Sequence, residues 1–542
     1  MTDFATVPHA PRSDKPALVA ALAQDLLAAD YTVDGVAELL GEEANQALAR
    51  DQTVHAAMVL RGTSTALASL IRLWLLAQSI SGRELELALP TSWPDVMELG
   101  LIEGTGEQGQ VRAAVDLRPY GWPAAEDQGQ DTNLWVASDL GAHQRPGVLH
   151  KDHVLGIGQA SLTLAQGTMR RPVKRALDLG TGCGIQLFHL LHHAESVVAT
   201  DISERALAFT RFNLALNAPA LGLSPTDFDA GNTAARVSLR LGSLLEPVAG
   251  ERFDLVVSNP PFVITPRRQG EQSSEQFTYR DGGLAGDAIV ESLVRQLPDI
   301  LSPGGTAQML GNWEIPSDGG TVMPWHSRPA QWLATGTEAW FIQREQVSPG
   351  AYAQTWLQDA SQGRDATAYA AAYEEYLLDF ASRDVAAIGF GYIMLRRPTE
   401  GESAAAARFE EILYPIEQPV GPRLADALDR ALWLKQNPDL SQVHLLVAGD
   451  VTEERHQRPG AEHPGVILLR QGAGLRRTNL LSTELAGFVS ACDGELSVGQ
   501  IIGALAVLLE RGDAHFVEAL AAEVRNLVLD GFLHPDAGLG GS

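Results

Sequence analysis

Short apolar runs alternate with helix-like patterns through the middle of this chain. Each run is dominated by aliphatic and β-branched residues, which is typical of a buried strand. The stretches between the first five runs carry apolar residues at the spacing of a helix face. This alternation predicts an α/β fold with a mostly parallel sheet covered on both faces. We expect strands at 176–179, 196–200, 237–241, 253–258, 306–310, 339–344 and 388–395, with a helical insertion at 351–380.

The patterns on either side of this α/β region are different. Residues from about 16 to 120 show helical periodicity followed by a glycine-tipped alternating segment, which looks like a winged-helix domain. Residues 121–133 are rich in Pro, Gly, Gln and Asp and are predicted to form a linker. The stretch from about 424 to 535 is similar to winged-helix peptide-recognition modules of the PqqD type, with a plain helical bundle as the alternative. We therefore expect an N-terminal helical, winged-helix-like domain at 1–130, the α/β domain at 139–400 and a C-terminal winged-helix-like domain at 420–536.

The charge of the chain narrows the partners that we expect. The 542 residues carry a net charge of −27, which repels phosphate backbones and disfavours an autonomous nucleic-acid-binding enzyme. Contacts with proteins through the terminal domains fit this charge better. Arg267-Arg268 is a local basic exception, and it is a candidate contact for a backbone phosphate or for an acidic protein segment.

Cysteine usage and hydropathy predict a cytoplasmic protein without a metal centre. Cys183 and Cys492 are the only cysteines in the sequence, so disulfides do not organise the fold. No Cys/His cluster has the spacing of a metal site. No apolar run is long enough to cross a bilayer, and the N-terminus lacks a basic-then-apolar signal.

A glycine-rich loop follows the first expected strand. Residues 176–179 lead into Gly180-Thr181-Gly182-Cys183-Gly184, and a helical pattern and a second strand follow, ending at Asp201. Glycines allow a tight turn and the close approach of a ligand to the backbone. An acid at the end of the second strand can accept both hydroxyls of a ribose. This order predicts a dinucleotide or nucleoside site, in which Cys183 fills space rather than acting as a nucleophile.

The spacing of the glycines separates two cofactors. A dinucleotide fingerprint is Gly-x-Gly-x-x-Gly, whereas this loop is Gly-x-Gly-x-Gly with Asp178 placed to bind an ammonium group. The segment resembles class I methyltransferases that use S-adenosylmethionine (SAM), and the resemblance implies a Rossmann-like sheet of seven strands with an antiparallel last strand. Related enzymes usually carry an Asp after the third strand, where this chain has Leu241-Gly242-Ser243-Leu244. The cofactor-binding residues that the resemblance implies are Asp178, Gly180, Thr181, Gly182, Cys183, Gly184, Asp201, Ile202, Gly242, Ser243 and Asn259.

A second motif, Asn259-Pro260-Pro261-Phe262, ends the fourth expected strand. Two prolines hold the backbone rigid, so the Asn259 side chain and the Pro260 carbonyl can accept hydrogen bonds from a planar NH₂ group on which Phe262 stacks. The motif resembles that of the N-methyltransferases. Together with 279–287 and 301–305, it is similar to HemK-type glutamine methyltransferases and to the small-domain rRNA guanine and tRNA adenine N-methyltransferases. The resemblance covers residues 148–398 and makes the four motif residues the expected catalytic set.

The resemblance leaves the methyl acceptor open. A glutamine side chain of a protein is favoured by the HemK-like segment and the acidic charge. Adenine N6 or guanine N2 in rRNA or tRNA is the alternative, favoured by Phe262 and by the flanking domains. A silent SAM-binding scaffold is a third hypothesis, against which the intact Asn259 argues. Gln159 and Ser161 occupy the place of a segment that closes over SAM in related enzymes.

Overall fold

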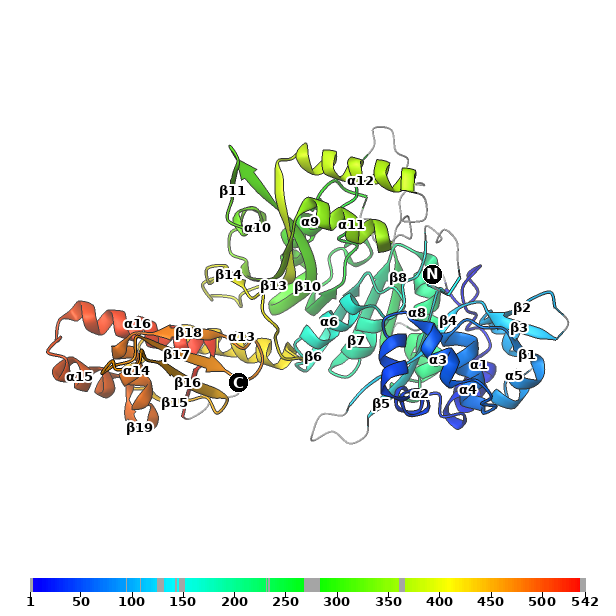
Figure 1. Ribbon diagram of the computed structural model, residues 1–542, viewed down its shortest axis with the longest axis horizontal. Helices are drawn as coiled ribbons and strands as arrows, with labels where there is room; N and C mark the ends of the chain where they lie inside the picture. Colours follow the sequence, from blue (N-terminus) through cyan, green and yellow to red (C-terminus); the bar gives the residue numbers. More distant parts are fainter. Residues whose placement is uncertain are drawn as a thin grey trace. The chain divides into compact units, whose positions relative to one another are not determined.

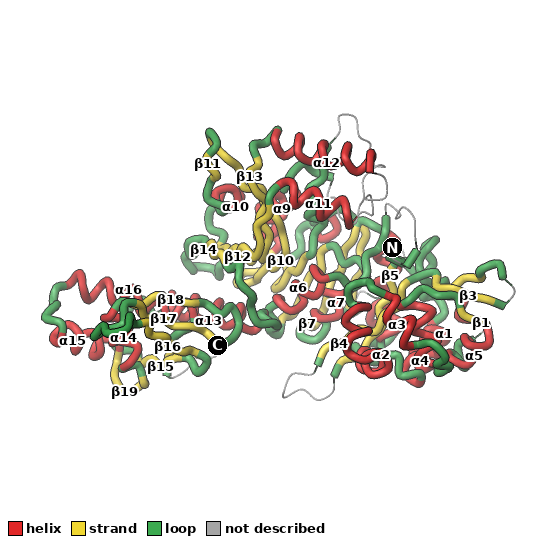
Figure 2. Tube along the Cα trace, viewed as in Figure 1, coloured by secondary structure: helices red, strands yellow, loops and turns green. Residues whose placement is uncertain are grey.

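The computed structural model describes residues 3–93, 95–107, 109–123, 131–141, 144–145, 152–230, 232, 234–267, 283–359 and 366–536. The chain forms two compact units, whose elements are labelled in Figure 1 and coloured by type in Figure 2. Unit 1 comprises residues 1–165 and 172–411, and unit 2 comprises residues 166–171 and 412–542. Among the helices of these described ranges, none has the length and apolar content that a membrane span requires.

The large sheet of unit 1 has the expected mixed topology. Its strands lie in the order β14-β12-β13-β10-β9-β6-β7-β8. The five strands from β10 to β8 pair in parallel, whereas β13 is antiparallel to both of its neighbours. The strands are β6 (Val173–Leu179), β7 (Ala194–Asp201), β8 (Val237–Leu241), β9 (Phe253–Ser258), β10 (Leu301–Asp318), β12 (Glu338–Val347), β13 (Val385–Arg396) and β14 (Arg408–Glu411).

All seven expected strands are present, but within the described residues the sheet contains nine. The additional strands are β11 (Thr321–Val322), which pairs with β10, and the edge strand β14, which pairs in parallel with β12. The sequence of β14, Arg-Phe-Glu-Glu, lacks an apolar run because three of its side chains are charged. Only pairing with β12 makes it a strand. β10 is also longer than expected, because its polar residues are buried against β13 and the helices.

Helices cover both faces of this sheet, as the alternation predicted. Leu177, Val256 and Met309 belong to an apolar core that also contains side chains of α9 (Ala288–Ile300) and α10 (Ser327–Trp332). Side chains alternate between the two faces of a strand, so Asp178 lies on the opposite face. There it accepts a hydrogen bond from an amide of α7. The other helices around the sheet are α6 (Gln159–Gly167), α7 (Ile185–Leu190), α8 (Glu204–Asn217), α11 (Pro349–Asp359) and α12 (Ala366–Ala381).

The N-terminal part of unit 1 combines short helices with a three-stranded antiparallel sheet of order β1-β3-β2. Thr32, Thr65 and Ser81 each cap a helix by accepting a hydrogen bond from a backbone N–H of the first turn. The elements are α1 (Pro16–Ala28), α2 (Val33–Leu48), α3 (Thr53–Val59), α4 (Ala66–Leu70), the π-helix η1 (Ile71–Leu75), β1 (Ile80–Ser81), α5 (Gly82–Ala88), the 3₁₀ helix η2 (Asp95–Leu99), β2 (Ile102–Gly104) and β3 (Gln110–Ala113).

The predicted linker at 121–133 is wrong at both of its described ends. Gly121 pairs with Asn133, and Trp122 pairs with Thr132, in the antiparallel ladder of β4 (Asp116–Trp122) and β5 (Thr132–Ser138). Pro, Gly and Asp are frequent in turns as well as in linkers, so composition did not distinguish a hairpin from a linker. Residues 124–130 lie outside the described part of the chain.

Two buried asparagines of α8 attach β5 to the large sheet's helices. The Asn213 amide accepts from Ala137 N at 2.8 Å and donates to Ala137 O at 3.0 Å. Asn217 makes the same pair of bonds to Trp135, at 2.8 and 2.7 Å. Asn213 Nδ2 also donates to the carbonyl of Cys183, at 2.9 Å, in the glycine loop. The two amides thus bind an edge of β5 as a neighbouring strand would.

Unit 2 has its own apolar core, to which Phe488, Phe516 and Phe532 contribute. Cys492 is buried in this core, and its thiol lies 3.2 Å from Leu445 O. Two three-stranded sheets, β19-β15-β20 and β16-β17-β18, accompany the helices. The elements are α13 (Gly421–Gln436), β15 (His444–Val447), β16 (Val451–His456), β17 (Val466–Gln471), β18 (Thr478–Leu481), α14 (Thr483–Ser490), β19 (Asp493–Ser497), α15 (Val498–Leu508), α16 (Ala514–Asp530) and β20 (Leu533–Pro535).

We predict that Asn213→Ala destabilises unit 1 by about 3 kcal/mol, because it leaves buried backbone groups of β5 without partners. The free energy of unfolding from a urea titration measures the effect. Gln46→Ala is the matched control, since Gln46 is exposed and donates to Glu42 on the surface of its own helix. The control should stay within about 0.5 kcal/mol of wild type. An equally small effect of Asn213→Ala would show that the amide does not hold β5.

Candidate active site at the carboxyl edge of the sheet

The parallel register brings the three expected key residues to one edge of the sheet. Leu179 pairs with Thr200 on one side and with Ser258 on the other. Asp178, Asp201 and Asn259 therefore lie within one residue of the same level, at the carboxyl ends of adjacent strands. Ligands bind at this edge in open α/β sheets, at the point where the strand order reverses. Here the reversal lies between β6 and β9.

The glycine loop has a backbone that only glycine adopts readily. Gly180, Gly182 and Gly184 have φ of +78°, +57° and +97°. The N–H groups of Gly180 and Thr181 both donate to Thr200 O at 2.9 Å, which ties the loop to β7. A Cβ at Gly180 or Gly182 would meet no atom within 4 Å, so the space beside the loop is open. The loop is therefore shaped by backbone conformation and leaves room for a ligand.

Asp178 is fully buried and only half satisfied. Its Oδ2 accepts from Thr181 Oγ1 at 2.7 Å and from Leu187 N at 3.0 Å. Its Oδ1 has no hydrogen-bond partner among the residues that the structure describes. Burial raises the pKa of this carboxyl to about 7, although the bonds from Thr181 and Leu187 favour the charged form. Such a group favours a cationic partner at its free oxygen.

Asp201 both shapes the loop and presents a carboxylate. Its Oδ2 accepts from Gly182 N at 3.0 Å, and its Oδ1 accepts from Ser203 N at 2.9 Å. Burial raises the pKa of Asp201. Each oxygen keeps a second lone pair for a hydroxyl donor. Ile202, the next residue, is 58% exposed and provides an apolar surface beside the carboxylate.

Gly242 and Ser243 also lie at this edge, because Asp201 pairs with Leu241. Gly242 N donates to Asp201 O at 3.0 Å, and a Cβ at Gly242 would lie 2.4 Å from Pro247 Cγ. The Ser243 carbonyl accepts from Glu246 N at 3.0 Å, which begins a short turn. The position after the third strand thus offers backbone groups and a hydroxyl where related enzymes usually have a carboxylate.

The Asn259-Pro260-Pro261-Phe262 motif leaves acceptors free at the end of β9. The Asn259 Oδ1 is buried and has no hydrogen-bond partner within the described ranges. The Pro260 carbonyl accepts from Phe262 N at 2.8 Å, which closes a tight turn and leaves the second lone pair of the carbonyl available. Phe262 is partly buried against the apolar core under α9. Pro261, which lies between Pro260 and Phe262 in the chain, is partly buried.

Among the residues that the structure describes, four near this edge carry a buried side-chain oxygen without a hydrogen-bond partner. They are Asp178, Thr200, Asn259 and Asn312. Buried polar groups are normally hydrogen-bonded, and leaving one unpaired costs about 1–3 kcal/mol. Sequence reasoning missed Asn312, because the strand was expected to end at residue 310. An asparagine inside the long apolar stretch of β10 is the signal that identifies it.

The structure separates the weaker candidates from this set. Cys183 is buried, burial raises the pKa of its thiol to about 12, and the thiol therefore stays protonated. Ser161 O accepts from Gln186 Nε2 at 2.8 Å, which holds the start of α6 beside α7. The exposed Gln159 side chain instead donates to Thr163, within its own helix. Arg267 donates to Leu284 O at 3.1 Å, whereas Arg268 and residues 279–282 of the HemK-like segment lie outside the described residues.

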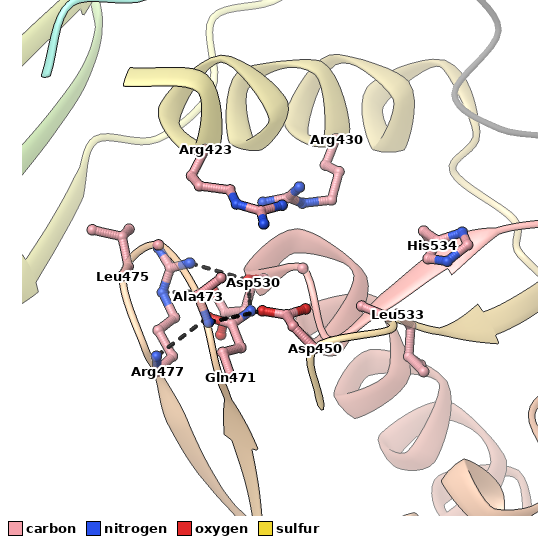
Figure 3. A pocket seen from close by; sticks show the side chains of 13 residues that line it. Arg423, Arg430, Asp450, Gln471, Ala473, Leu475, Arg477, Asp530, Leu533 and His534 are labelled. Atoms are coloured by element: carbon pink, nitrogen blue, oxygen red, sulfur yellow. Dashed lines mark hydrogen bonds and ion pairs between the residues drawn. The ribbon is translucent and has the colours of Figure 1, made fainter. Parts of the chain in front are cut away.

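Unit 2 contains a different hollow, of about 150 Å³, shown in Figure 3. Arg423 and Arg430 approach it from α13, and Arg477 approaches it from the opposite side. Arg477 Nη1 and Gln471 Nε2 donate to Asp530 O at 3.0 and 2.9 Å. Arg477 and Gln471 thus have hydrogen-bond partners here, in contrast to the four oxygens at the sheet edge. In the described parts of the chain, no three His, Cys, Asp or Glu side chains gather as metal ligands.

We predict that the stability of the unligated protein depends on pH through Asp178. Its pKa is raised from 3.8 to about 7 on folding, so the folded state retains a proton that the unfolded chain releases. Stability at this site is therefore highest below about pH 4 and falls as pH rises to about 7. Asp178→Asn does not titrate, so its stability relative to wild type should rise by about 3 kcal/mol between pH 5 and pH 8.

Urea titrations at four pH values measure this difference. Asp227→Asn is the control, because bonds from Ser224 lower the pKa of Asp227 and keep its titration below this range. Parallel stability profiles for wild type and Asp178→Asn would contradict the raised pKa.

Comparison with known proteins agrees with this geometry. Residues 140–319 match the family model described as "Methyltransferase small domain". Residues 28–114 match a family described as "Domain of unknown function (DUF7059)". The first match contains the glycine loop, Asp201, the Asn259 motif and Asn312.

Curated relatives resemble the same part of the chain. A release factor glutamine methyltransferase of Geobacter sulfurreducens is 35% identical over 24% of this chain and 42% of its own length. A ribosomal protein uL3 glutamine methyltransferase of Bradyrhizobium diazoefficiens is 32% identical over 29% and 46%. A ribosomal RNA small subunit methyltransferase C of Idiomarina loihiensis is 25% identical over 34% and 48%. The chain thus spans about half the length of these relatives. The expected resemblance of the α/β region to HemK-like class I methyltransferases is confirmed.

Proposed function

We propose that this protein is a SAM-dependent N-methyltransferase that methylates the side-chain amide of a glutamine in a protein. The observation that carries the proposal is the buried, unpartnered Asn259 Oδ1 beside a Pro260 carbonyl that keeps a free lone pair. Two such acceptors match the two N–H groups of a primary amide. Several curated relatives of this segment are named as protein glutamine methyltransferases.

Each chemical group of SAM has a suitable residue at this edge of the sheet. The free Oδ1 of Asp178 suits the methionine ammonium, and the Asp201 oxygens suit the ribose hydroxyls. The exposed Ile202 offers an apolar surface to the adenine, and Gly242-Ser243 lie where its amine would be bound. The conformations of Gly180, Gly182 and Gly184 leave open space for this ligand. When bound, SAM supplies a methyl group on a sulfonium, which is a good leaving group.

The residues of the chain position and activate the acceptor nitrogen. An amide nitrogen is a poor nucleophile because its lone pair is delocalised into the carbonyl. Hydrogen bonds from the NH₂ group to Asn259 Oδ1 and Pro260 O raise the electron density on the nitrogen and stabilise the positive charge that develops there. The rigid Pro260-Pro261 backbone holds both acceptors in place before the substrate arrives. The exposed part of Phe262 provides a surface on which the planar amide stacks.

With SAM bound, its sulfonium would supply the methyl group, and Asn259 and Pro260 would hold the amide nitrogen in line with it. The N–H proton that the methylated amide must lose would pass from its hydrogen bond with the Asn259 or Pro260 oxygen to water. Alignment of the nitrogen with the methyl group is thus the main task of the site, rather than acid–base chemistry.

A nucleobase amine is the second candidate acceptor. The relative from Idiomarina loihiensis is named as a ribosomal RNA methyltransferase, and the aromatic residue of the motif is Phe262. A base in a helix must first be flipped out, at a cost of a few kcal/mol, which a glutamine side chain avoids. The net charge of −27 also opposes RNA binding. A silent SAM-binding scaffold would have no need of the free Asn259 oxygen.

We further propose three domains, at 1–130, 139–400 and 420–536, with winged-helix-like folds at both ends. The strand order β1-β3-β2, with α5 and η2 between β1 and β2, supports this for the N-terminal domain. The sheet β19-β15-β20, with α15 and α16 between β19 and β20, supports it for the C-terminal domain. These domains are proposed to contact the protein substrate.

Asn259→Ala should lower methyl transfer by about 100-fold or more, because it removes a preorganised acceptor. The dissociation constant for SAM, measured by calorimetry, should change far less than turnover, because Asp178 and Asp201 make the principal proposed contacts with the cofactor. Asn259→Asp is the matched control, since it keeps an acceptor oxygen and should retain more activity than the alanine variant. Wild-type turnover by Asn259→Ala would remove Asn259 from the mechanism.

Incubation of the enzyme with methyl-labelled SAM and cell extract identifies the acceptor class. We expect that protease, and not nuclease, destroys the labelled macromolecule, and that acid hydrolysis yields methylated glutamine. A label that is lost only with nuclease would replace glutamine by the nucleobase alternative.

Asp201→Ala should weaken SAM binding at least tenfold, because the ribose hydroxyls and Gly182 N lose their acceptor. Calorimetric titration with SAM measures the change, and Asp227→Ala controls for loss of an acidic side chain far from the edge. An unchanged dissociation constant would contradict the ribose assignment.

A further inference from the structure

A second buried amide lies beside the Asn259 motif. Asn312 of β10 is 0% exposed, and its side chain lies 3.1 Å from the Tyr352 hydroxyl. The same hydroxyl accepts from Ile264 N at 2.8 Å. The other end of the Asn312 amide has no hydrogen-bond partner among the described residues. Asn312 and Tyr352 thus join β10 and α11 to the loop that begins at Asn259.

The register places Asn312 on the same face of the sheet as Asn259. Val257 pairs with Gln308 and Ser258 pairs with Met309, so Asn259 is level with residue 310. Side chains alternate along a strand, and Met309 and Trp313 belong to the core under α9. Asn312 therefore points to the other face, which is the face to which the alternation along β9 assigns Asn259. It lies about 7 Å further along the strand direction, which is two residues of strand rise.

The loop from Asn259 to Ile264 connects the end of β9 to Tyr352. It leaves the sheet at Asn259, and Ile264 N donates to the Tyr352 hydroxyl. The two unpartnered amides of Asn259 and Asn312 thus lie on one face, near the two ends of the same six-residue loop. A planar group of a few atoms bound between them would satisfy both.

The number of buried groups left without a hydrogen bond indicates which end of the Asn312 amide is free. The amide can be turned by 180° without moving other atoms. If Nδ2 faces Tyr352, both the hydroxyl proton and Asn312 Oδ1 lack a partner in the described structure. If Oδ1 faces Tyr352, it accepts the hydroxyl proton, and only the Nδ2 group is left over. The second orientation leaves fewer buried groups unsatisfied and is therefore favoured.

We propose that the Asn312 NH₂ group donates to the carbonyl oxygen of the acceptor amide, and that Asn312 makes the site specific for a carboxamide. This inference rests on the proposed function. A primary amide presents two N–H donors and one carbonyl acceptor. Asn259 Oδ1 and Pro260 O receive the donors, and Asn312 binds the acceptor. An amine without an adjacent acceptor would leave the Asn312 NH₂ group without a partner. A site whose buried donor is left unpaired by the wrong substrate discriminates strongly against that substrate.

Asn312→Asp tests this role without removing the contact to Tyr352. The carboxylate still accepts from Tyr352, but it presents an oxygen to the substrate carbonyl instead of a donor. We expect kcat/KM for the protein acceptor to fall about 10- to 100-fold, with an unchanged dissociation constant for SAM and an unchanged Tm. Asn312→Ala should show a similar loss and replaces Asn312→Asp if the buried carboxylate lowers Tm.

Tyr352→Phe is the structural control, because it keeps Asn312 and removes only the hydroxyl that orients it. If Asn312 merely anchors Tyr352, Asn312→Asp will match wild type and Tyr352→Phe will be the impaired variant. If the wild type methylates protein, that outcome overturns the role of Asn312 and leaves the proposed function standing. A wild type that labels only nuclease-sensitive material, or nothing, overturns the proposed function and this inference together.

Discussion

The parallel pairing of β6 with β7 and β9 is the constraint on which the site depends. Backbone hydrogen bonds set Leu179 level with Thr200 and with Ser258, so three chain segments far apart in sequence end at one edge. Each strand then delivers one polar side chain: Asp178, Asp201 and Asn259. A register shift of one residue would turn these side chains to the opposite face and bury the acids in the apolar core. The core residues Leu177 and Val256 oppose such a shift, because it would remove them from the apolar core under α9.

The glycine loop is held by a side chain of α8 as well as by its backbone hydrogen bonds to β7. Asn213 binds the Cys183 carbonyl and both backbone groups of Ala137, so one amide links the loop, α8 and β5. A strand edge that lacks a neighbouring strand normally exposes its N–H and C=O groups. Asn213 and Asn217 supply the missing partners with side chains. The loop conformation is thereby tied to a hairpin that precedes the α/β region in sequence.

The site itself is recognised by what is left unsatisfied. Around the hollow of unit 2, Arg477 and Gln471 both donate to Asp530 O. Near the sheet edge, Asp178, Asn259 and Asn312 keep buried oxygens or amides that no other described residue binds. An unligated protein is less stable for carrying such groups. The proposed ligands would satisfy these groups with a cation, an amide NH₂ group and a carbonyl.

The sequence alone determined the local elements of the α/β region and most of the candidate site. Apolar period, glycine conformation and proline rigidity act over a few residues, so the seven strands, the loop at 180–184 and the motif at 259–262 could be predicted. Tertiary structure decided what depends on distant partners. β14 is a strand only because β12 offers an edge, residues 121–133 begin and end in a hairpin because Trp122 pairs with Thr132, and Asn312 joins the site only through the register of β10. Local patterns do not encode these pairings, because backbone hydrogen bonds between strands form between residues that are remote along the chain.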